Sequence, residues 1–150
     1  MRSRIALLTM VVLLVGVASM AGETAWFDMT SCDMCKSMSS TEGLMDHMTW
    51  NQYDLSNGVI SVTTVEPAYL DKYRAAHAEM GKAMESMEKG EKTSLCGSCT
   101  YLGMCMQKGA SHDYVETETG DIFIVTASNP ELVAELQTWA KRNREEMAKM

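Results

Sequence analysis

Two Cys-x-x-Cys motifs lie in corresponding places of the two halves of this chain. Cys32 is followed by Cys35 and Cys96 by Cys99, each across a two-residue spacer. The spacer lets both sulfur atoms of a motif turn toward one centre, and a thiolate is both a nucleophile and a metal ligand. The motifs therefore predict soft-metal binding or thiol chemistry, with two short-range disulfides as the alternative.

Further soft ligands surround the motifs. Met34 lies inside the first, and His47 and His112 follow the two motifs at offsets of 12 and 13 residues. Cys105 is left over as the odd fifth cysteine. Thioether and thiolate together suit Cu(I), and zinc takes thiolate with imidazole, so we expect copper first and zinc second. The candidate metal ligands are Cys32, Cys35, Cys96, Cys99, Cys105, His47, His112 and Met34.

The sequence leaves open whether the two motifs share one four-sulfur site or form two sites. We expect two, because the second motif has further soft ligands close by and a shared site would leave Cys105 without a role. In that arrangement His47 or Met34 completes the first site, and Cys105 or His112 completes the second.

The elements around the motifs form an internal repeat of roughly 63 residues. Each motif is followed by a glycine turn, an apolar strand and a proline that can open a helix. The turns contain Gly58 and Gly120, and the prolines are Pro67 and Pro130. The expected fold is α+β, with two αββα repeats forming a four-stranded antiparallel sheet on which the helices pack. A pseudo-twofold axis would relate the halves.

Local patterns place the helices and strands. A helix is expected to start beside Cys32 at Thr30-Ser31 and to resume over residues 42–48, after a lead-in over 23–29 that is extended or a short strand. Strands are expected over 49–55, 59–65, 112–118 and 121–127. The long helix after Pro67 carries an apolar seam that includes His77, which we interpret as a core histidine. The inward stripe after Pro130 is Val133, Leu136, Ala140, Asn143 and Met147.

The first 21 residues match a secretory signal peptide. Arg2 and Arg4 precede an apolar run, and Ser19-Met20-Ala21 is a small-residue cleavage site. We therefore expect a periplasmic or secreted protein with no stable membrane insertion after cleavage, organised as repeats 22–91 and 92–150 in one compact unit. Without the two arginines, 11 basic residues face 20 acidic ones, a net charge near −9 that disfavours nucleic-acid partners.

The stretch Met29-Thr30-Ser31-Cys32-Asp33-Met34-Cys35 resembles the Met-Thr-Cys-x-x-Cys loop of heavy-metal-associated domains, the copper-chaperone family. The resemblance covers about 60 residues of the first half, with Ser31 as one extra residue in the loop. It implies that Cys32 and Cys35 are metal ligands. The function expected is metal handling by binding, buffering or delivery, with a partner protein for transfer, rather than catalytic turnover.

Trp26 before Cys32-Asp33-Met34-Cys35-Lys36 is similar to the active-site stretch of thioredoxins. That fold needs a cis-proline before a later strand, whereas Pro67 and Pro130 open helices. An exported thiol–disulfide oxidoreductase is therefore the alternative function, and a disulfide-stabilised binding module without metal is the third. No residue spacing indicates a hydrolase.

Overall fold

The computed structural model describes residues 24–150, so the predicted signal peptide lies outside the described residues. The strands are β1 Met48–Leu55, β2 Gly58–Val65, β3 Ser111–Thr117 and β4 Gly120–Thr126. The helices are α1 Lys36–Ser40, α2 Leu70–Glu88, α3 Gly97–Gln107 and α4 Pro130–Met147. Two 3₁₀ turns, η1 Met45–His47 and η2 Pro67–Tyr69, precede β1 and α2. Each half thus contains a short helix, a hairpin and a long helix, as the repeat predicts.

The four strands form one antiparallel sheet in the order β1-β2-β4-β3, which confirms the predicted α+β class. The inner strands of the two hairpins pair in a symmetric register. Gly58 pairs with Thr126, and Gly120 pairs with Thr64. The register is centred on the pair Ser61 and Phe123, where a pseudo-twofold axis would cross the sheet. The two halves therefore share a sheet.

Glycine is needed at the two symmetric ends of the central strand pair. A Cβ atom at Gly58 would lie 2.0 Å from the carbonyl oxygen of Val125, and one at Gly120 would lie 2.2 Å from that of Thr63. Gly120 also has a φ of 150°. No L side chain fits such a close backbone approach, so the hairpin glycines fix the join between the repeats as well as the turns.

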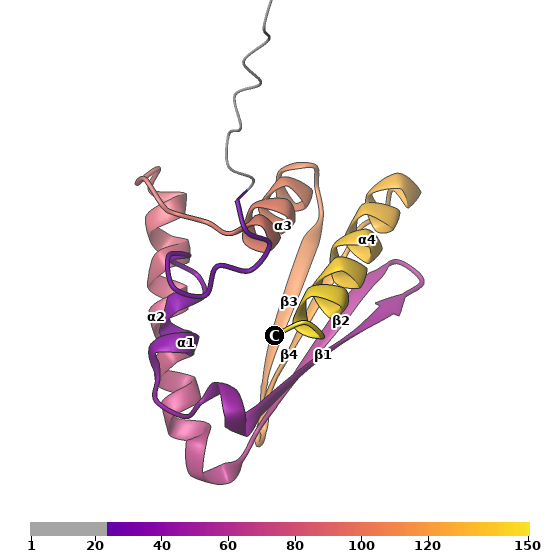
Figure 1. The fold of residues 1–150 in the computed structure, drawn as a ribbon. Helices are drawn as coiled ribbons and strands as arrows, with labels where there is room; N and C mark the ends of the chain where they lie inside the picture. The colour runs from indigo at the N-terminus through magenta and orange to yellow at the C-terminus, as the bar shows by residue number, and fades with distance from the viewer. Residues whose placement is uncertain (1–23) are drawn as a thin grey trace, which may run out of the picture.

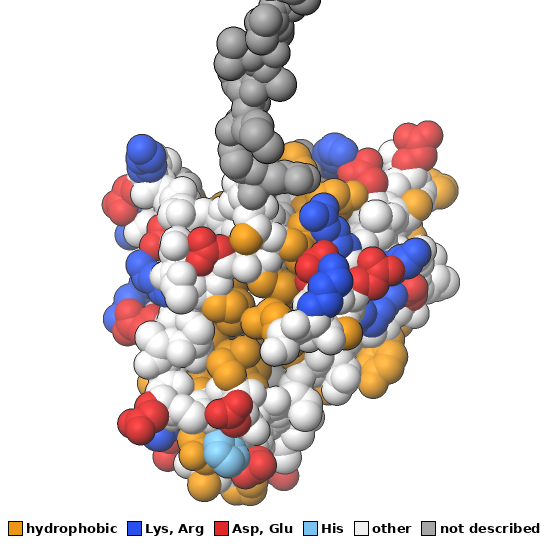
Figure 2. Space-filling view, viewed as in Figure 1, with side chains coloured by type: hydrophobic (Ala, Val, Ile, Leu, Met, Phe, Trp, Pro, Cys, Tyr) orange, Lys and Arg blue, Asp and Glu red, His pale blue; other side chains and the backbone are white. Residues whose placement is uncertain are grey.

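The helices of the described chain all lie on one face of the sheet (Figure 1). α4 packs over β1 and β2, where Leu136 and Ala140 are fully buried with Val59. α2 approaches the other hairpin, where the buried Tyr73 hydroxyl donates a hydrogen bond to Asp121 on β4. Viewed from the helix side, hydrophobic side chains gather in the middle of the molecule, between α2 and α4 (Figure 2).

Most strand and helix bounds agree with the predictions to within one or two residues. Asn129 caps α4 by accepting a hydrogen bond from the Glu131 amide at 2.8 Å, with Pro130 in the first turn. The expected helix over 42–48 is wrong: only the three residues of η1 are helical there, because Gly43 takes a φ of 73° and breaks the run. The lead-in after residue 23 contains no strand.

Candidate metal centre

The two cysteine motifs converge on one cluster. The sulfur atoms of Cys32, Cys35, Cys96 and Cys99 all lie within 4.8 Å of one another. The Sγ of Cys99 is 3.8 Å from that of Cys32 and 3.7 Å from that of Cys35. The expectation of two separate sites is therefore wrong. Both motifs stand at the head of their repeats, and the pseudo-twofold arrangement brings the two heads together.

The two motifs reach the cluster through different local structures. Cys96 is the N-cap of α3, and its carbonyl oxygen accepts a hydrogen bond from the Thr100 amide at 2.9 Å. Cys32 instead begins a turn in which its carbonyl accepts from the amides of Cys35 and Lys36, and α1 starts only at Lys36. The predicted helix start at Thr30-Ser31 is wrong, because the Asp28 carboxylate accepts hydrogen bonds from both amides and folds these residues into a turn.

Backbone hydrogen bonds hold the two motif loops together. The Asp33 amide donates to the Ser94 carbonyl at 2.8 Å, and the Ser94 amide donates to the Asp33 carboxylate at 2.7 Å. The Lys36 ammonium hydrogen-bonds the same carboxylate and, with the Ser94 amide, lowers its pKa. The Ser98 amide donates to the Trp26 carbonyl at 2.9 Å. The relative position of the four sulfur atoms is thus fixed by the protein itself.

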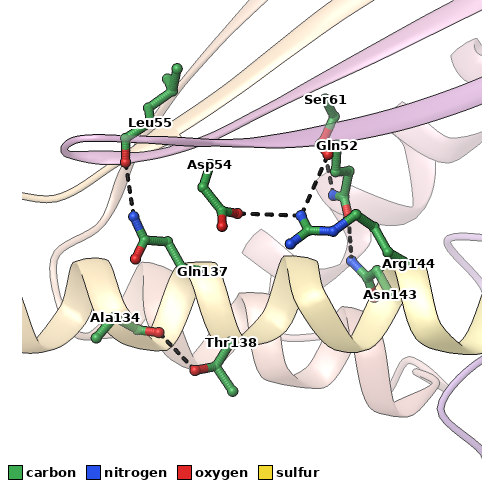
Figure 3. A network of polar contacts seen from close by, with 9 residues as sticks. All are labelled: Gln52, Asp54, Leu55, Ser61, Ala134, Gln137, Thr138, Asn143 and Arg144. Carbon is green, nitrogen blue, oxygen red and sulfur yellow. Dashed lines mark hydrogen bonds and ion pairs between the residues drawn. The ribbon is translucent and has the colours of Figure 1, made fainter.

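A buried polar network connects the second motif to α4 and the sheet. The amide oxygen of Asn143 on α4 accepts hydrogen bonds at 2.8 Å from the Ser98 hydroxyl and from the Trp26 indole. Its amide nitrogen donates to Gln52 on β1 at 3.0 Å, and Gln52 donates in turn to Ser61. Figure 3 shows this end of the network, where α4 faces the β1–β2 hairpin. Ser98 lies between the two cysteines of its motif, so the network links the site to the sheet.

The four thiols differ in burial and in acidity. Cys32 and Cys96 are 1% exposed, whereas Cys35 and Cys99 are partly exposed. The hydrogen bond from Cys35 lowers the pKa of Cys32 to about 6, and the bond from Cys32 lowers the pKa of Cys96. The same bonding to Cys32 raises the pKa of both Cys35 and Cys99. In this arrangement Cys32 and Cys96 are buried thiolates, and the partly exposed thiols of Cys35 and Cys99 stabilise them. Cys35 and Cys99 keep their protons because four negative charges at this spacing would repel one another.

Metal affinity should rise steeply with pH. Above about pH 6 an incoming ion displaces protons from Cys35 and Cys99, so each pH unit should strengthen binding about hundredfold, tenfold for each proton released. Below about pH 6 Cys32 also gains a proton and the dependence becomes steeper. Competition titration against a chelator at several pH values measures this slope. A pH-independent affinity would contradict a thiolate site.

The other candidate ligands lie apart from the four-cysteine cluster. Cys105 is fully buried in the hydrophobic cluster between α3, α4 and the sheet, and this burial raises its pKa. The Nδ1 atom of His47 lies 3.0 Å from the Glu66 carboxylate. His112 is exposed on β3, with its ring near Phe123. Among the described residues, the four motif cysteines form a group that could hold a metal ion. Cys105, His47 and His112 are not part of this group. A role for the Met34 thioether stays a prediction.

No protein-family model, curated protein or solved structure matches this chain. None of the helices in residues 24–150 has the length and hydrophobicity that a bilayer-crossing segment needs.

Proposed function

We propose that this chain is an exported metal-binding protein that holds one soft metal ion in its four-cysteine cluster. The observation that carries the proposal is the convergence of Cys32, Cys35, Cys96 and Cys99 within 4.8 Å. Export rests on the signal-peptide pattern of residues 1–21. Two of the four thiols, Cys35 and Cys99, are partly exposed, which suits transfer of the ion to the thiolates of a partner protein.

We place zinc before copper, in reverse of the order expected from the sequence, because a set of four thiolates is a common tetrahedral zinc site. Four thiolates about 2.3 Å from a central Zn²⁺ in a tetrahedron stand about 3.8 Å apart. The two cross-motif distances to Cys99, 3.8 and 3.7 Å, match this spacing. Cu(I) is the second choice, since it also binds thiolates. The resemblance to heavy-metal-associated domains supports metal handling in general.

The burial pattern favours metal binding over thiol–disulfide exchange. A redox enzyme needs a thiolate that is accessible to its substrate. Here the thiols with a lowered pKa, Cys32 and Cys96, are 1% exposed, and the partly exposed Cys35 and Cys99 have a raised pKa. No thiol of the cluster is both acidic and exposed.

Metal analysis of protein purified without chelator should find one ion per chain, and X-ray absorption should find four sulfur neighbours at about 2.3 Å. Cys96→Ser should weaken binding at least about hundredfold, since loss of a mere supporting residue costs 10–100-fold in other sites. Cys105→Ser is the matched control and should keep one ion. Two ions in the parent, or loss of metal in both variants, would overturn the single shared site.

A further inference from the structure

The face of the sheet opposite the helices lacks a cover in residues 24–150. Strand registers place four residues from each strand on this bare face, in rows that run across the sheet. They are Thr49, Asn51, Tyr53, Leu55, Gly58, Ile60, Val62, Thr64, Ser111, Asp113, Val115, Thr117, Gly120, Ile122, Ile124 and Thr126. None of them belongs to the hydrophobic clusters on which the helices pack. The bare face is thus a second, unpartnered surface on which seven of the sixteen residues are apolar: Tyr53, Leu55, Ile60, Val62, Val115, Ile122 and Ile124.

The centre of the bare face is aliphatic. Ile60 pairs with Ile124, and Val62 pairs with Ile122, on either side of the pseudo-twofold centre. Tyr53 and Val115 extend this patch on the outer strands, where they are 57% and 49% exposed. Large exposed side chains gathered in one patch are typical of interaction surfaces.

Charge is nearly absent from the bare face. Asp113 is the only charged residue among its sixteen, whereas 22% of the whole chain is charged. A positively charged partner would therefore gain little electrostatic attraction from the bare face. Two copies of this chain, each with a net charge of −7, repel through their acidic surfaces but can meet here with few carboxylates between them.

The size of the bare face suits a weak dimer that forms only at high concentration, since a stable interface buries more than about 1,000 Å². Strands about 4.8 Å apart and about 3.4 Å per residue give a face of roughly 450 Å². Two such faces bury roughly 900 Å², above most crystal contacts and below the standard interface of about 1,600 Å². Sheets that pack face to face align within about 30° and interdigitate side chains of this kind.

We propose that the bare face docks a second copy of this chain, forming a sheet-on-sheet dimer with twofold symmetry. The cysteine clusters lie at the starts of α1 and α3, on the helix side of each copy and away from this interface (Figure 1). The proposal therefore stands apart from the metal-binding function.

Sedimentation of metal-loaded protein in reductant should show a mass that rises from monomer toward dimer as the concentration increases. Ile60→Lys and Tyr53→Lys should each raise the dissociation constant of the dimer at least tenfold, because each places an unpaired ammonium in the interface. Tyr53 is 57% exposed, so its variant should fold even if Ile60→Lys does not.

Ala134→Lys, which adds the same charge at an exposed position of α4, is the matched control and should dimerise like the parent. A Cys35→Ser/Cys99→Ser variant should dimerise as well, which separates this proposal from the metal site. A parent that stays monomeric at every concentration would overturn the proposal. A dimer weakened by Ala134→Lys as much as by Tyr53→Lys would overturn it too.

Discussion

Removing the metal with a chelator is expected to lower the free energy of unfolding by several kcal/mol. Binding to the folded state alone stabilises it by about 4 kcal/mol when free metal exceeds Kd a thousandfold. Without a cation, the buried thiolates of Cys32 and Cys96 repel one another. The ion would also tie together two loops that are distant in sequence. Urea unfolding with and without chelator measures the difference.

Two cysteine variants locate this stabilisation. Cys96→Ser should unfold at the same urea concentration with and without chelator, because its site is broken. Cys105→Ser should be destabilised by its change in the buried core yet keep the full chelator effect, since Cys105 lies outside the cluster. If the parent unfolds at the same urea concentration with and without chelator, metal binding does not stabilise the fold.

The repeat made the fold predictable from the sequence. Glycine turns, alternating strands and helix-opening prolines are local signals, and each recurs in the second half near the same offset. Asn57-Gly58 and Asn129-Pro130 in particular act through backbone geometry that neighbouring residues determine. The short helical segment after Thr41 was less predictable, because the positive φ of Gly43 competes there with an apolar pattern typical of a helix.

The four cysteines were predictable as candidate ligands, but the convergence of the two pairs was not. Sequence spacing determines only that the two cysteines within each pair lie close together. The distance between the two pairs depends on the shared sheet and on long-range hydrogen bonds such as those between Asp33 and Ser94. Cys105 was expected to be a ligand, but it lies in the buried core. A buried cysteine behaves as a small hydrophobic residue, so it needs no ligand role.

The residues of the buried polar network were harder to predict from the sequence than the cysteines. Asn143 was predicted to face inward with Leu136 and Ala140, and all three are fully buried. A polar residue on an apolar stripe requires hydrogen-bond partners, but the sequence could not show that these are Ser98, Trp26 and Gln52.

Asn143→Ala is expected to cost about 3 kcal/mol or more of folding free energy. The substitution leaves the Trp26 indole and the Gln52 amide oxygen unpaired, and each buried unpaired polar group costs about 1–3 kcal/mol. The Ser98 hydroxyl also loses its acceptor, although it still accepts a hydrogen bond from the Trp139 indole. Because Ser98 lies between Cys96 and Cys99, the variant should also release metal to a chelator faster than the parent. Urea unfolding and stopped-flow metal release measure the two effects.

Thr138→Ala on the same helix provides the control for both effects. Thr138 is exposed, and its hydroxyl bonds only the Ala134 carbonyl one turn earlier (Figure 3), so its loss should change the stability by no more than about 0.5 kcal/mol. Equal stability of the two variants would contradict a role for the buried network. If Asn143→Ala destabilises the chain but leaves the metal release rate unchanged, the network supports the fold without positioning the second motif. Faster release confined to Asn143→Ala would show that the sheet, through Gln52 and Asn143, helps to hold the sulfur atoms of the second motif in place.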